Sequence, residues 1–309
     1  MKRLDQLSLR QLRALQTVAQ TGNISVAAEQ LGLTGPAVHS QLKTLEEIIG
    51  SPLIVRQGRA RNSVTPQGEV LLEAYDELRA ALERAITNIN ALNHGHSGSV
   101  VLGVVSTGKY FAPRIVALCQ REFPGIEISL SIANRRDTVA SLKRGALDLC
   151  IMGRPPRDPL THEIALGEHP HIVIAAADHP LARVPHVPRE ALLSERWVMR
   201  EEGSGTRILA ARFLDEIGLG HTAPTLEMDS NETIKQAVLS GLGLAMISAH
   251  TVAEELASGR LVALKVEGSP IYRQWYLLSG QDRPLSPAAE KVRDWIVGHT
   301  GDYFPKLDI

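Results

Sequence analysis

The sequence predicts an all-α winged helix-turn-helix domain and a long linker helix, followed by an α/β region of two Rossmann-like lobes. Three observations lead to this prediction: two short helical patterns separated by a glycine, an apolar repeat with steps of four and three, and strand–helix–strand alternation in the C-terminal two thirds. The 309 residues suffice for two or three domains. We place these domains at 1–65, 66–94, 95–167 with 273–309, and 168–272.

Composition excludes several classes of protein. The chain is 44% hydrophobic and 22% charged, and no apolar run is long enough to span a bilayer. Charges are scattered through the N-terminus and no small-residue cleavage site follows, so we expect a cytoplasmic protein without a membrane contact. Cys119 and Cys150 lie in apolar segments, which favours two buried thiols over a disulfide or redox pair.

The first two helices are predicted from caps and apolar spacing. Ser8 and Gln11 form a capping box, and apolar residues recur at helical spacing until Thr21. A second helix over 25–30 carries adjacent alanines, which allow another helix to approach closely. Gly32 supplies the turn that follows, because glycine adopts a positive φ at little cost.

The third helix is expected to begin after Thr34, a suitable N-cap, with Pro36 in its first turn. Apolar residues at 38, 42 and 45 face inward, so polar groups face outward. Two short helices joined by a tight turn are typical of a helix-turn-helix, whose second helix fits the major groove of DNA. A plain helical hairpin with a solvated face is the alternative. The predicted DNA contacts from this helix are Thr34, Gly35, Pro36, His39, Ser40 and Lys43.

A basic hairpin follows. Residues 51–65 predict two short strands around a glycine-containing turn that carries Arg56, Arg59 and Arg61. Next to a helix-turn-helix, such a hairpin indicates a wing whose arginines reach phosphates or a narrow minor groove. The charge distribution agrees, because residues 1–65 hold eight basic and four acidic side chains while the whole chain has a net charge of −1.

A long helix starts at Thr65-Pro66 and carries an apolar repeat typical of a coiled-coil seam. Such a seam usually pairs two chains, and a dimer would present two recognition helices to a two-fold DNA site. A core helix of the next domain is the alternative. The seam consists of Leu71, Tyr75, Leu78, Leu82, Ala85, Ile89 and Leu92.

In combination, these features resemble the LysR-type transcriptional regulators. The match covers AAEQLGLTGPAVHSQLKTLEE, the wing PLIVRQGRARNSVTPQG, the linker helix and the overall length. Gly35, His39 and Ser40 stand where the family usually has Gln, Ser and Arg, so base readout is not carried over to them, whereas Pro36, Lys43 and Arg56 match. The resemblance implies a homodimer and a dimer of dimers on an interrupted palindrome in double-stranded DNA, acting on RNA polymerase.

The remaining two thirds of the chain alternate strands and helices, which predicts parallel sheets with crossover helices in two lobes. A final helix over 287–297 is expected to pack back on the first lobe. The predicted strands are 100–105, 126–132, 147–152, 171–176, 197–199, 225–228 and 244–247, and the predicted helices are 110–123, 137–144, 206–217 and 232–239.

Ligands of parallel α/β sheets bind outside the carboxyl ends of the strands. The segments at these ends offer helix N-terminal amides and fixed cations suited to phosphate or carboxylate. Ordinary caps with surface charges are the alternative, and Glu201 and Glu202 would repel an anion unless they point away or pair with arginines. The predicted effector-binding residues are Ser106, Thr107, Gly108, Lys109, Asn134, Arg135, Arg154, Ser204, Gly205, Thr206, Arg207, Asn231 and Lys235.

Several of these segments resemble the LysR-type regulators of Calvin–Benson–Bassham carbon-fixation operons: STGKYFAPRIVAL, DLCIMGRPP, EEGSGTR and SNETIKQAVLSGLGLAMIS. The resemblance implies two lobes like those of periplasmic binding proteins and activation of genes for ribulose bisphosphate carboxylase. It implies an effector that is a phosphorylated metabolite, such as ribulose 1,5-bisphosphate, phosphoenolpyruvate or NADPH, and no resident cofactor. A LysR-type regulator of another operon that senses a small carboxylate is the alternative.

Other classes lack their sequence signatures. The GSGT segment has no P-loop ending, no Gly-x-Gly-x-x-Gly follows a strand, and there is no nucleophile elbow, so we do not expect an enzyme. His162, His169 and His171 are interpreted as structural or solvent-facing rather than as metal ligands, and no metal site is expected. Free-standing bilobed solute-binding proteins are exported and lack a basic helical N-terminus.

Overall fold

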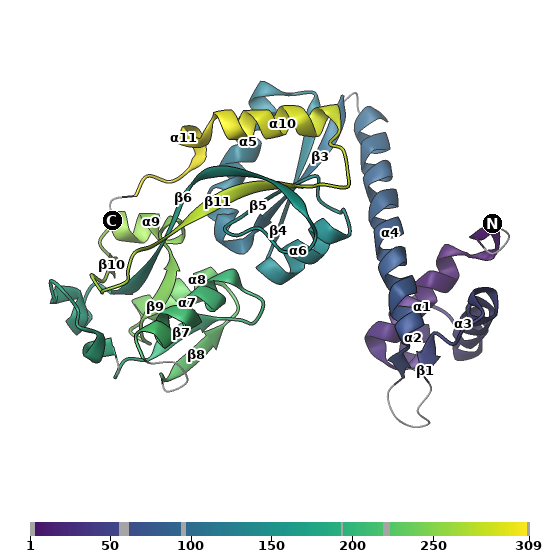
Figure 1. Cartoon of the computed structure of the whole chain (residues 1–309), viewed down its shortest axis with the longest axis horizontal. Helices are drawn as coiled ribbons and strands as arrows, with labels where there is room; N and C mark the ends of the chain where they lie inside the picture. Colours follow the sequence, from purple (N-terminus) through teal and green to yellow (C-terminus); the bar gives the residue numbers. More distant parts are fainter. Residues whose placement is uncertain (1–3, 56–61, 94–96, 193, 219–222, 308–309) are drawn as a thin grey trace. The chain divides into compact units, whose positions relative to one another are not determined.

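The computed structural model describes residues 4–55, 62–93, 97–192, 194–218 and 223–307, and the chain forms two units, Met1–Glu83 and Arg84–Ile309 (Figure 1). The N-terminal unit begins with a 3₁₀ helix, Leu4–Gln6. Among the described residues, no helix combines the length and hydrophobicity needed to cross a membrane.

The helix-turn-helix consists of α1 (Leu9–Thr21), α2 (Ile24–Leu31) and α3 (Gly35–Ile49). The predicted capping box at the start of α1 is present. Asn23 caps α2 with its side chain, which starts that helix one residue earlier than predicted, and Thr34 caps α3. The predicted inward residues of α3 are buried, with the two alanines of α2, in one apolar core.

The wing begins with the short strand β1 (Ile54–Val55) and ends with the short strand β2 (Ser63–Val64), which pair antiparallel. Glu46 Oε1 on α3 accepts hydrogen bonds from the amides of Leu53 (2.8 Å) and Ile54 (3.3 Å), which fixes β1 against the helix-turn-helix. The two strands confirm the predicted hairpin. Arg56, Arg59 and Arg61 lie outside the described residues, so their DNA contacts stay a prediction.

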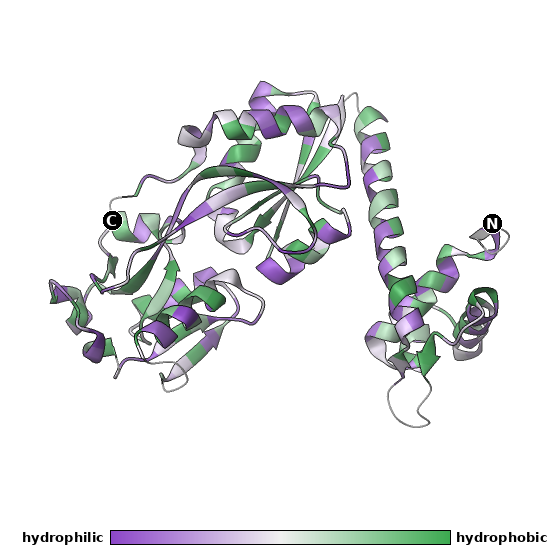
Figure 2. Cartoon of the chain, viewed as in Figure 1, coloured by the Kyte–Doolittle hydropathy of each residue, from purple (hydrophilic) through white to green (hydrophobic). Residues whose placement is uncertain are grey.

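The predicted long helix is confirmed as α4 (Pro66–Asn93). Gly68 lets it approach β1, because a Cβ at this position would overlap the Leu53 carbonyl oxygen. Leu71 and Tyr75 pack in the helix-turn-helix core. Hydrophobic residues recur along α4 (Figure 2). Beyond Tyr75 the seam is exposed: Leu78, Leu82, Ile89 and Leu92 have 40–62% of their surface accessible.

The first lobe of the C-terminal unit contains the parallel strands β3 (Gly98–Val105), β4 (Ile126–Ala133) and β5 (Leu149–Met152). Its helices are the 3₁₀ helix η2 (Ser106–Tyr110), α5 (Ala112–Glu122), α6 (Arg135–Lys143), α10 (Pro287–Gly298) and α11 (Thr300–Tyr303). The last helices pack on this lobe as predicted, since α10 contacts β3 and α5. Cys119 and Cys150 are free and buried in its core, which confirms the predicted burial.

The second lobe contains the parallel pair β7 (Trp197–Arg200) and β8 (Thr225–Met228), with β9 (Ala245–Ser248) next to β7 through a bridge from Trp197 to Leu244. Its remaining elements are α7 (Gly205–Glu216), α8 (Asn231–Leu239), α9 (Ala253–Ala257), β10 (Leu261–Ala263) and the 3₁₀ helices η3 (Pro180–Arg183), η4 (Arg189–Leu192) and η6 (Ala249–Thr251).

Two long strands run through both lobes, β6 (Thr161–Ala176) and β11 (Ile271–Gly280), side by side and antiparallel (Figure 1). They make the main sheet mixed, in the order β10-β6-β11-β5-β3-β4, whereas the sequence predicted parallel sheets. Only the buried second half of β6 has a continuous apolar run, so its first half was missed, as were β10 and β11. The predicted lobe boundaries at 167/168 and 272/273 fall inside these two strands and stay predictions.

Candidate ligand-binding site

A cavity of about 410 Å³ opens between the two lobes of the C-terminal unit. Its wall is built from the ends of β3 and β5, the first turns of α6 and α7, and the middle of β6 and β11. This is the edge of the sheet that the sequence predicted for a ligand. The predicted residues that line it are Ser106, Thr107, Arg135, Arg154, Ser204, Gly205 and Thr206.

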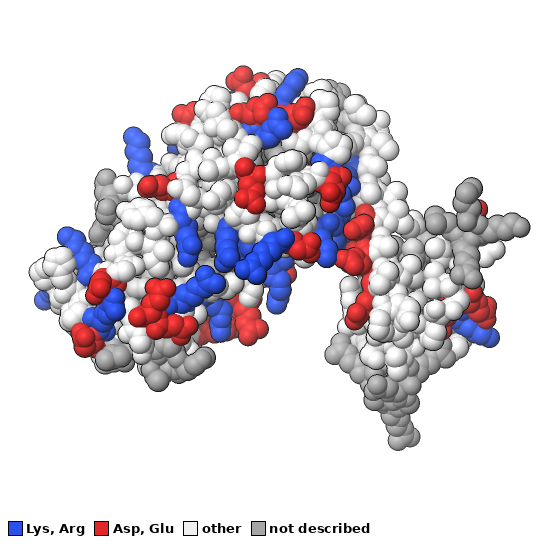
Figure 3. All heavy atoms as spheres, in the orientation of Figure 1, with Lys and Arg blue, Asp and Glu red and all other residues white. Residues whose placement is uncertain are grey.

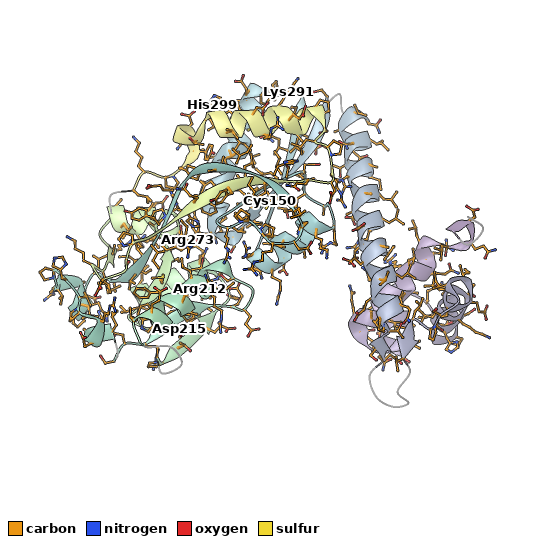
Figure 4. The ribbon with its side chains drawn as sticks, in the orientation of Figure 1. Cys150, Arg212, Asp215, Arg273, Lys291 and His299 are labelled. Carbon is orange, nitrogen blue, oxygen red and sulfur yellow. The ribbon has the colours of Figure 1, made fainter. Side chains whose placement is uncertain are left out.

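The cavity is strongly cationic. Arg135 and Arg154 approach it from the first lobe, Arg212 from α7 and Arg273 from β11, and Figure 4 labels the last two. No Asp or Glu stands among the described residues that line it. Figure 3 shows a band of Lys and Arg side chains across the middle of the C-terminal unit. A guanidinium group binds phosphate or carboxylate with two parallel hydrogen bonds, and no carboxylate among the described lining residues competes for these four arginines.

Arg135 lies deepest of these arginines and is partly used by the protein. Its guanidinium donates to the carbonyl oxygens of Arg154 and Pro155, which shapes the loop after β5. Burial, together with the neighbouring Arg154, lowers the pKa of Arg135. Arg154, Arg212 and Arg273 make no ion pair with any residue that the structure describes, so their charges are available to a ligand.

The N-terminus of α7 faces the same cavity. Ser204 and Thr206 are buried, Gly205 lies between them, and the side chain of Ser204 makes no capping hydrogen bond. The first amides of a helix have no intrahelical acceptor, and the helix dipole favours an anion there. The twelve-residue helix therefore adds amide donors to the arginines.

Six predicted effector residues lie outside the cavity lining. Asn134 caps α6 by accepting from the Asp137 amide, and Gly108 is needed because a Cβ would overlap the Val104 side chain. Arg207 donates to the carbonyl oxygen of Arg200 (2.6 Å) and to Glu227 (2.5 Å), on the other side of the α7 turn. The six residues are Gly108, Lys109, Asn134, Arg207, Asn231 and Lys235.

Lys109 and Lys235 belong to an ionic cluster that joins the lobes. Lys235 lies 3.1 Å from Glu232 and 3.1 Å from Glu255, and Lys109 lies 3.5 Å from Glu232. Both ammonium groups also stand over the ring of Tyr110. Since carboxylates already neutralise these two lysines, the structure assigns them to contacts between the lobes.

A buried arginine that the sequence did not single out also lies at this edge. Arg200 ends β7 with 2% of its surface exposed. Its guanidinium donates to both oxygens of Glu201 (2.7 and 2.9 Å), to Asn231 Oδ1 and to Ser106 Oγ (3.2 Å). The carboxylate of Glu201 is thus neutralised by an arginine, and Asn231 is occupied by the same guanidinium. The signal for Arg200 was its place directly after the predicted strand 197–199, at the end where ligand contacts are expected.

The cavity residues of β6 and β11 were missed as ligand contacts. His169 and His171 line the cavity and are buried. The sequence predicted structural or solvent-facing histidines, and the burial agrees with a structural role, but neither residue was expected at a ligand site. Burial lowers the pKa of both imidazoles, that of His171 to about 4. Arg273 and Gln274 were missed because β11 itself was not predicted.

The predicted DNA-binding face of α3 is largely accessible. Thr34, Pro36, Ser40 and Lys43 are exposed, while Gly35 and His39 are half-buried. Lys43 lies 3.8 Å from Glu47 in an exposed pair one turn apart, which costs little to break. All six positions stay predicted contacts.

A winged helix-turn-helix followed by a bilobed region with a cationic cavity defines a ligand-responsive DNA-binding regulator. Residues 9–69 match the family model described as bacterial regulatory helix-turn-helix protein, lysR family, and residues 93–301 match that of the LysR substrate binding domain. The chain belongs to the LysR family of bacterial transcriptional regulators.

Relatives of known role align along almost the whole chain. The HTH-type transcriptional regulator CbbR of Cereibacter sphaeroides is 47% identical over 307 residues, which is 99% of each chain. The RuBisCO operon transcriptional regulator of Allochromatium vinosum is 40% identical over 293 residues, 94% of this chain and 96% of its own length. Among solved structures, the CcmR regulatory domain of Synechocystis PCC6803 in complex with 2-PG has a TM-score of 0.61 and 34% identity, covering 65% of this chain and 97% of its own.

Proposed function

We propose that the protein activates carbon-fixation operons, including genes for ribulose bisphosphate carboxylase, when a phosphorylated metabolite binds in the cavity between its lobes. The observation that carries the effector class is the set of four arginines in a cavity that has no carboxylate among its described lining residues. The assignment to carbon-fixation operons is supported by the relatives, which are called CbbR and RuBisCO operon transcriptional regulator. The CcmR regulatory domain in complex with 2-PG supports a ligand site in the C-terminal unit.

Effector binding acts by shifting the balance between lobe arrangements. A ligand changes this balance only if it binds one arrangement more tightly than the other. The lining of the cavity supports this mechanism, because Arg135 and Arg154 belong to one lobe and Arg212 to the other. A ligand that reaches both lobes would favour the arrangement in which these arginines converge. Two hydrogen bonds within the protein also join the lobes at this edge: Arg200 donates to Ser106 Oγ, and the Arg136 amide donates to the carbonyl oxygen of Gly203.

The DNA-binding part of the proposal uses a dimer. Two chains pair along the exposed seam of α4 and present two α3 helices to a two-fold site in double-stranded DNA, and two dimers occupy an interrupted palindrome. The ligand-induced change then alters the spacing of the DNA-binding domains and contact with RNA polymerase. As a regulator of this kind the protein acts in the cytoplasm, without catalysis, cofactor or metal.

Promoter binding tests the operon assignment. Nuclease footprinting of the full-length protein on DNA upstream of the carbon-fixation genes of its own source should protect two half-sites and change on adding ribulose 1,5-bisphosphate, phosphoenolpyruvate or NADPH. Unrelated promoter DNA of equal length is the control. Equal protection of both DNAs would exclude the operon assignment. Specific protection that responds only to small carboxylates would favour a regulator with a different effector.

A further inference from the structure

We propose that His169 contacts the effector through an uncharged oxygen atom, so that the cavity selects phosphorylated ligands bearing a hydroxyl group. The inference rests on the proposed function, because it assigns the effector to the same cavity. It adds a residue that discriminates among anionic ligands, whereas the arginines attract all of them.

The imidazole of His169 is buried at the cavity wall without a partner. The residue is 4% exposed and lines the cavity. Neither ring nitrogen has a hydrogen-bond partner among the described residues. An unpaired buried polar group costs free energy, which a ligand that supplies the partner recovers.

The neighbouring histidines differ in this respect. His171 Nδ1 lies 3.2 Å from the carbonyl oxygen of His169, and His250 Nδ1 accepts a hydrogen bond of 3.3 Å from the indole N–H of Trp275. Both rings therefore have a partner within the protein. Of the three, His169 is the one whose hydrogen-bonding capacity is left for a molecule in the cavity.

The ring of His169 is held in position before any ligand arrives. It stacks on the indole of Trp275, with centroids 3.7 Å apart and an angle of 12°, and lies 4.2 Å from the ring of His171. On the cavity wall, Gly153 stands beside it, and a Cβ there would come within 2.6 Å of His169 Nδ1. The absence of a side chain at 153 therefore lets the imidazole lie against this part of the cavity wall.

The surroundings keep the imidazole neutral. Burial is the main cause that lowers the pKa of His169, and the nearby His171 and His250 lower it further. The other groups packed against it are the indole of Trp275 and the backbone at Gly153, so no carboxylate among the described contacts favours the protonated form.

A neutral imidazole has one donor and one acceptor nitrogen. A hydroxyl group can donate to the acceptor or accept from the donor, so it can pair with either nitrogen. An ionised phosphate or carboxylate only accepts, so it can pair with the N–H but leaves the acceptor nitrogen without a partner. The arginines therefore suit the anionic groups of the ligand, and His169 suits a hydroxyl between or beside them.

Calorimetric titration of the full-length protein at pH 8 tests the assignment with two probes. Ribulose 1,5-bisphosphate carries hydroxyl groups between two phosphates, and phosphoenolpyruvate carries a phosphate and a carboxylate without a hydroxyl. The His169→Phe variant keeps the aromatic stack but lacks both nitrogens, and His169→Gln restores a donor and an acceptor. His162→Phe, at an exposed position of the same strand outside the cavity, is the matched control.

We expect ribulose 1,5-bisphosphate to bind more tightly than phosphoenolpyruvate. His169→Phe should weaken the bisphosphate about tenfold, with less than a threefold effect on phosphoenolpyruvate, and His169→Gln and His162→Phe should stay within threefold of wild type for both. Equal weakening of both probes, no weakening, or tighter binding of phosphoenolpyruvate by wild type would overturn the role of His169 while the effector site stands. Binding of neither probe would exclude both metabolites as the effector and would also overturn the role of His169.

A measurement on the unmodified protein keeps the test independent of folding of the variants. Binding enthalpies in buffers of different ionisation enthalpy report the protons taken up with the ligand. At pH 8 the phosphates are already ionised, so contact with a neutral imidazole predicts uptake close to zero. Uptake of about one proton would mean that a charged group contacts a histidine, and would overturn the hydroxyl assignment.

Discussion

The hydroxyl group of Tyr110 donates a hydrogen bond of 2.6 Å to Glu232 Oε1 and so joins the turn after β3 to the first turn of α8. The two residues belong to different lobes, and Lys109 and Lys235 flank the pair. Burial and the Glu232 carboxylate raise the pKa of Tyr110, so the phenol stays protonated at any physiological pH. The two lobes are thus joined by a hydrogen bond from a neutral phenol to a charged carboxylate, and the phenol does not lose its proton at physiological pH.

Tyr110→Phe should lower the stability of the C-terminal unit by about 1–2 kcal/mol. The substitution removes the phenol donor, so the charged Glu232 carboxylate loses this hydrogen bond. Lys109→Met is the matched control: its pair with Glu232 is longer and partly exposed, so we expect a change below about 0.5 kcal/mol. Urea unfolding followed by tryptophan fluorescence measures both, since all three tryptophans lie in this unit. Equal effects would show that the ion pair, and not the phenol, holds this contact.

Glu201→Ala should destabilise the protein by about 3 kcal/mol, because it removes both carboxylate oxygens from a guanidinium that is almost fully buried. The adjacent and exposed Glu202→Ala should change stability by less than about 0.5 kcal/mol. Thermal unfolding of the two variants side by side measures the difference. A stable Glu201→Ala protein would mean that Arg200 finds another anion.

Substitutions on α4 should separate the chains of the predicted dimer. Leu82→Asp places a charge in the exposed seam, whereas Ala81→Asp places it at the next exposed position, off the seam. Sedimentation should show loss of dimer for Leu82→Asp alone, with unchanged helical content by circular dichroism. Dissociation by both variants, or by neither, would place the dimer contact elsewhere.

Removal of a cation from α3 should weaken DNA binding in a salt-dependent way. Lys43→Met should lower affinity for promoter DNA and reduce the slope of log affinity against log salt by about 1, without changing effector affinity. The same result is expected for Arg56→Ala from the sequence. Lys291→Met on α10 is the control and should keep the wild-type slope. An unchanged slope in Lys43→Met would exclude a phosphate contact at that position.

The C-terminal unit should lose stability as the solution becomes acidic. In the folded protein, burial lowers the pKa of His171 and of His250 to about 4, below the ordinary value of 6.5. The unfolded chain therefore binds more protons between these values, and each imidazole removes up to about 1.4 kcal/mol per pH unit as the pH falls from 6.5 to about 4. Urea unfolding across this range should give a shallower dependence for His250→Gln than for wild type. The exposed His162→Gln should match wild type.

The sequence predicted the helix-turn-helix, the wing strands and the long helix because their signals are local: caps at Ser8 and Thr34, a glycine turn, and an apolar repeat. It also predicted Ser106, Arg135, Arg154 and Ser204 at one edge, because the ends of neighbouring strands meet there.

The two long strands could not be predicted in the same way. The first half of β6 is mostly exposed or half-buried and contains Gly167, so it has no continuous apolar run. Its partner β11 pairs with it across a separation of about a hundred residues. Without them, the cavity contacts at His169 and Arg273 had no strand to place them. Arg207 was wrongly placed at the cavity. It lies in the first turn of α7, whose N-terminus faces the cavity, but its side chain points toward Glu227 and does not line the cavity.

Calorimetric titration of the full-length protein with ribulose 1,5-bisphosphate, phosphoenolpyruvate and NADPH tests the central claim most directly, with Arg154→Ala and Arg207→Ala as a matched pair. Arg154 lines the cavity and Arg207 does not. We predict saturable binding of at least one of these ligands, lost in Arg154→Ala and retained in Arg207→Ala. Absence of binding by all three, or equal loss in the two variants, would contradict a phosphorylated effector in this cavity.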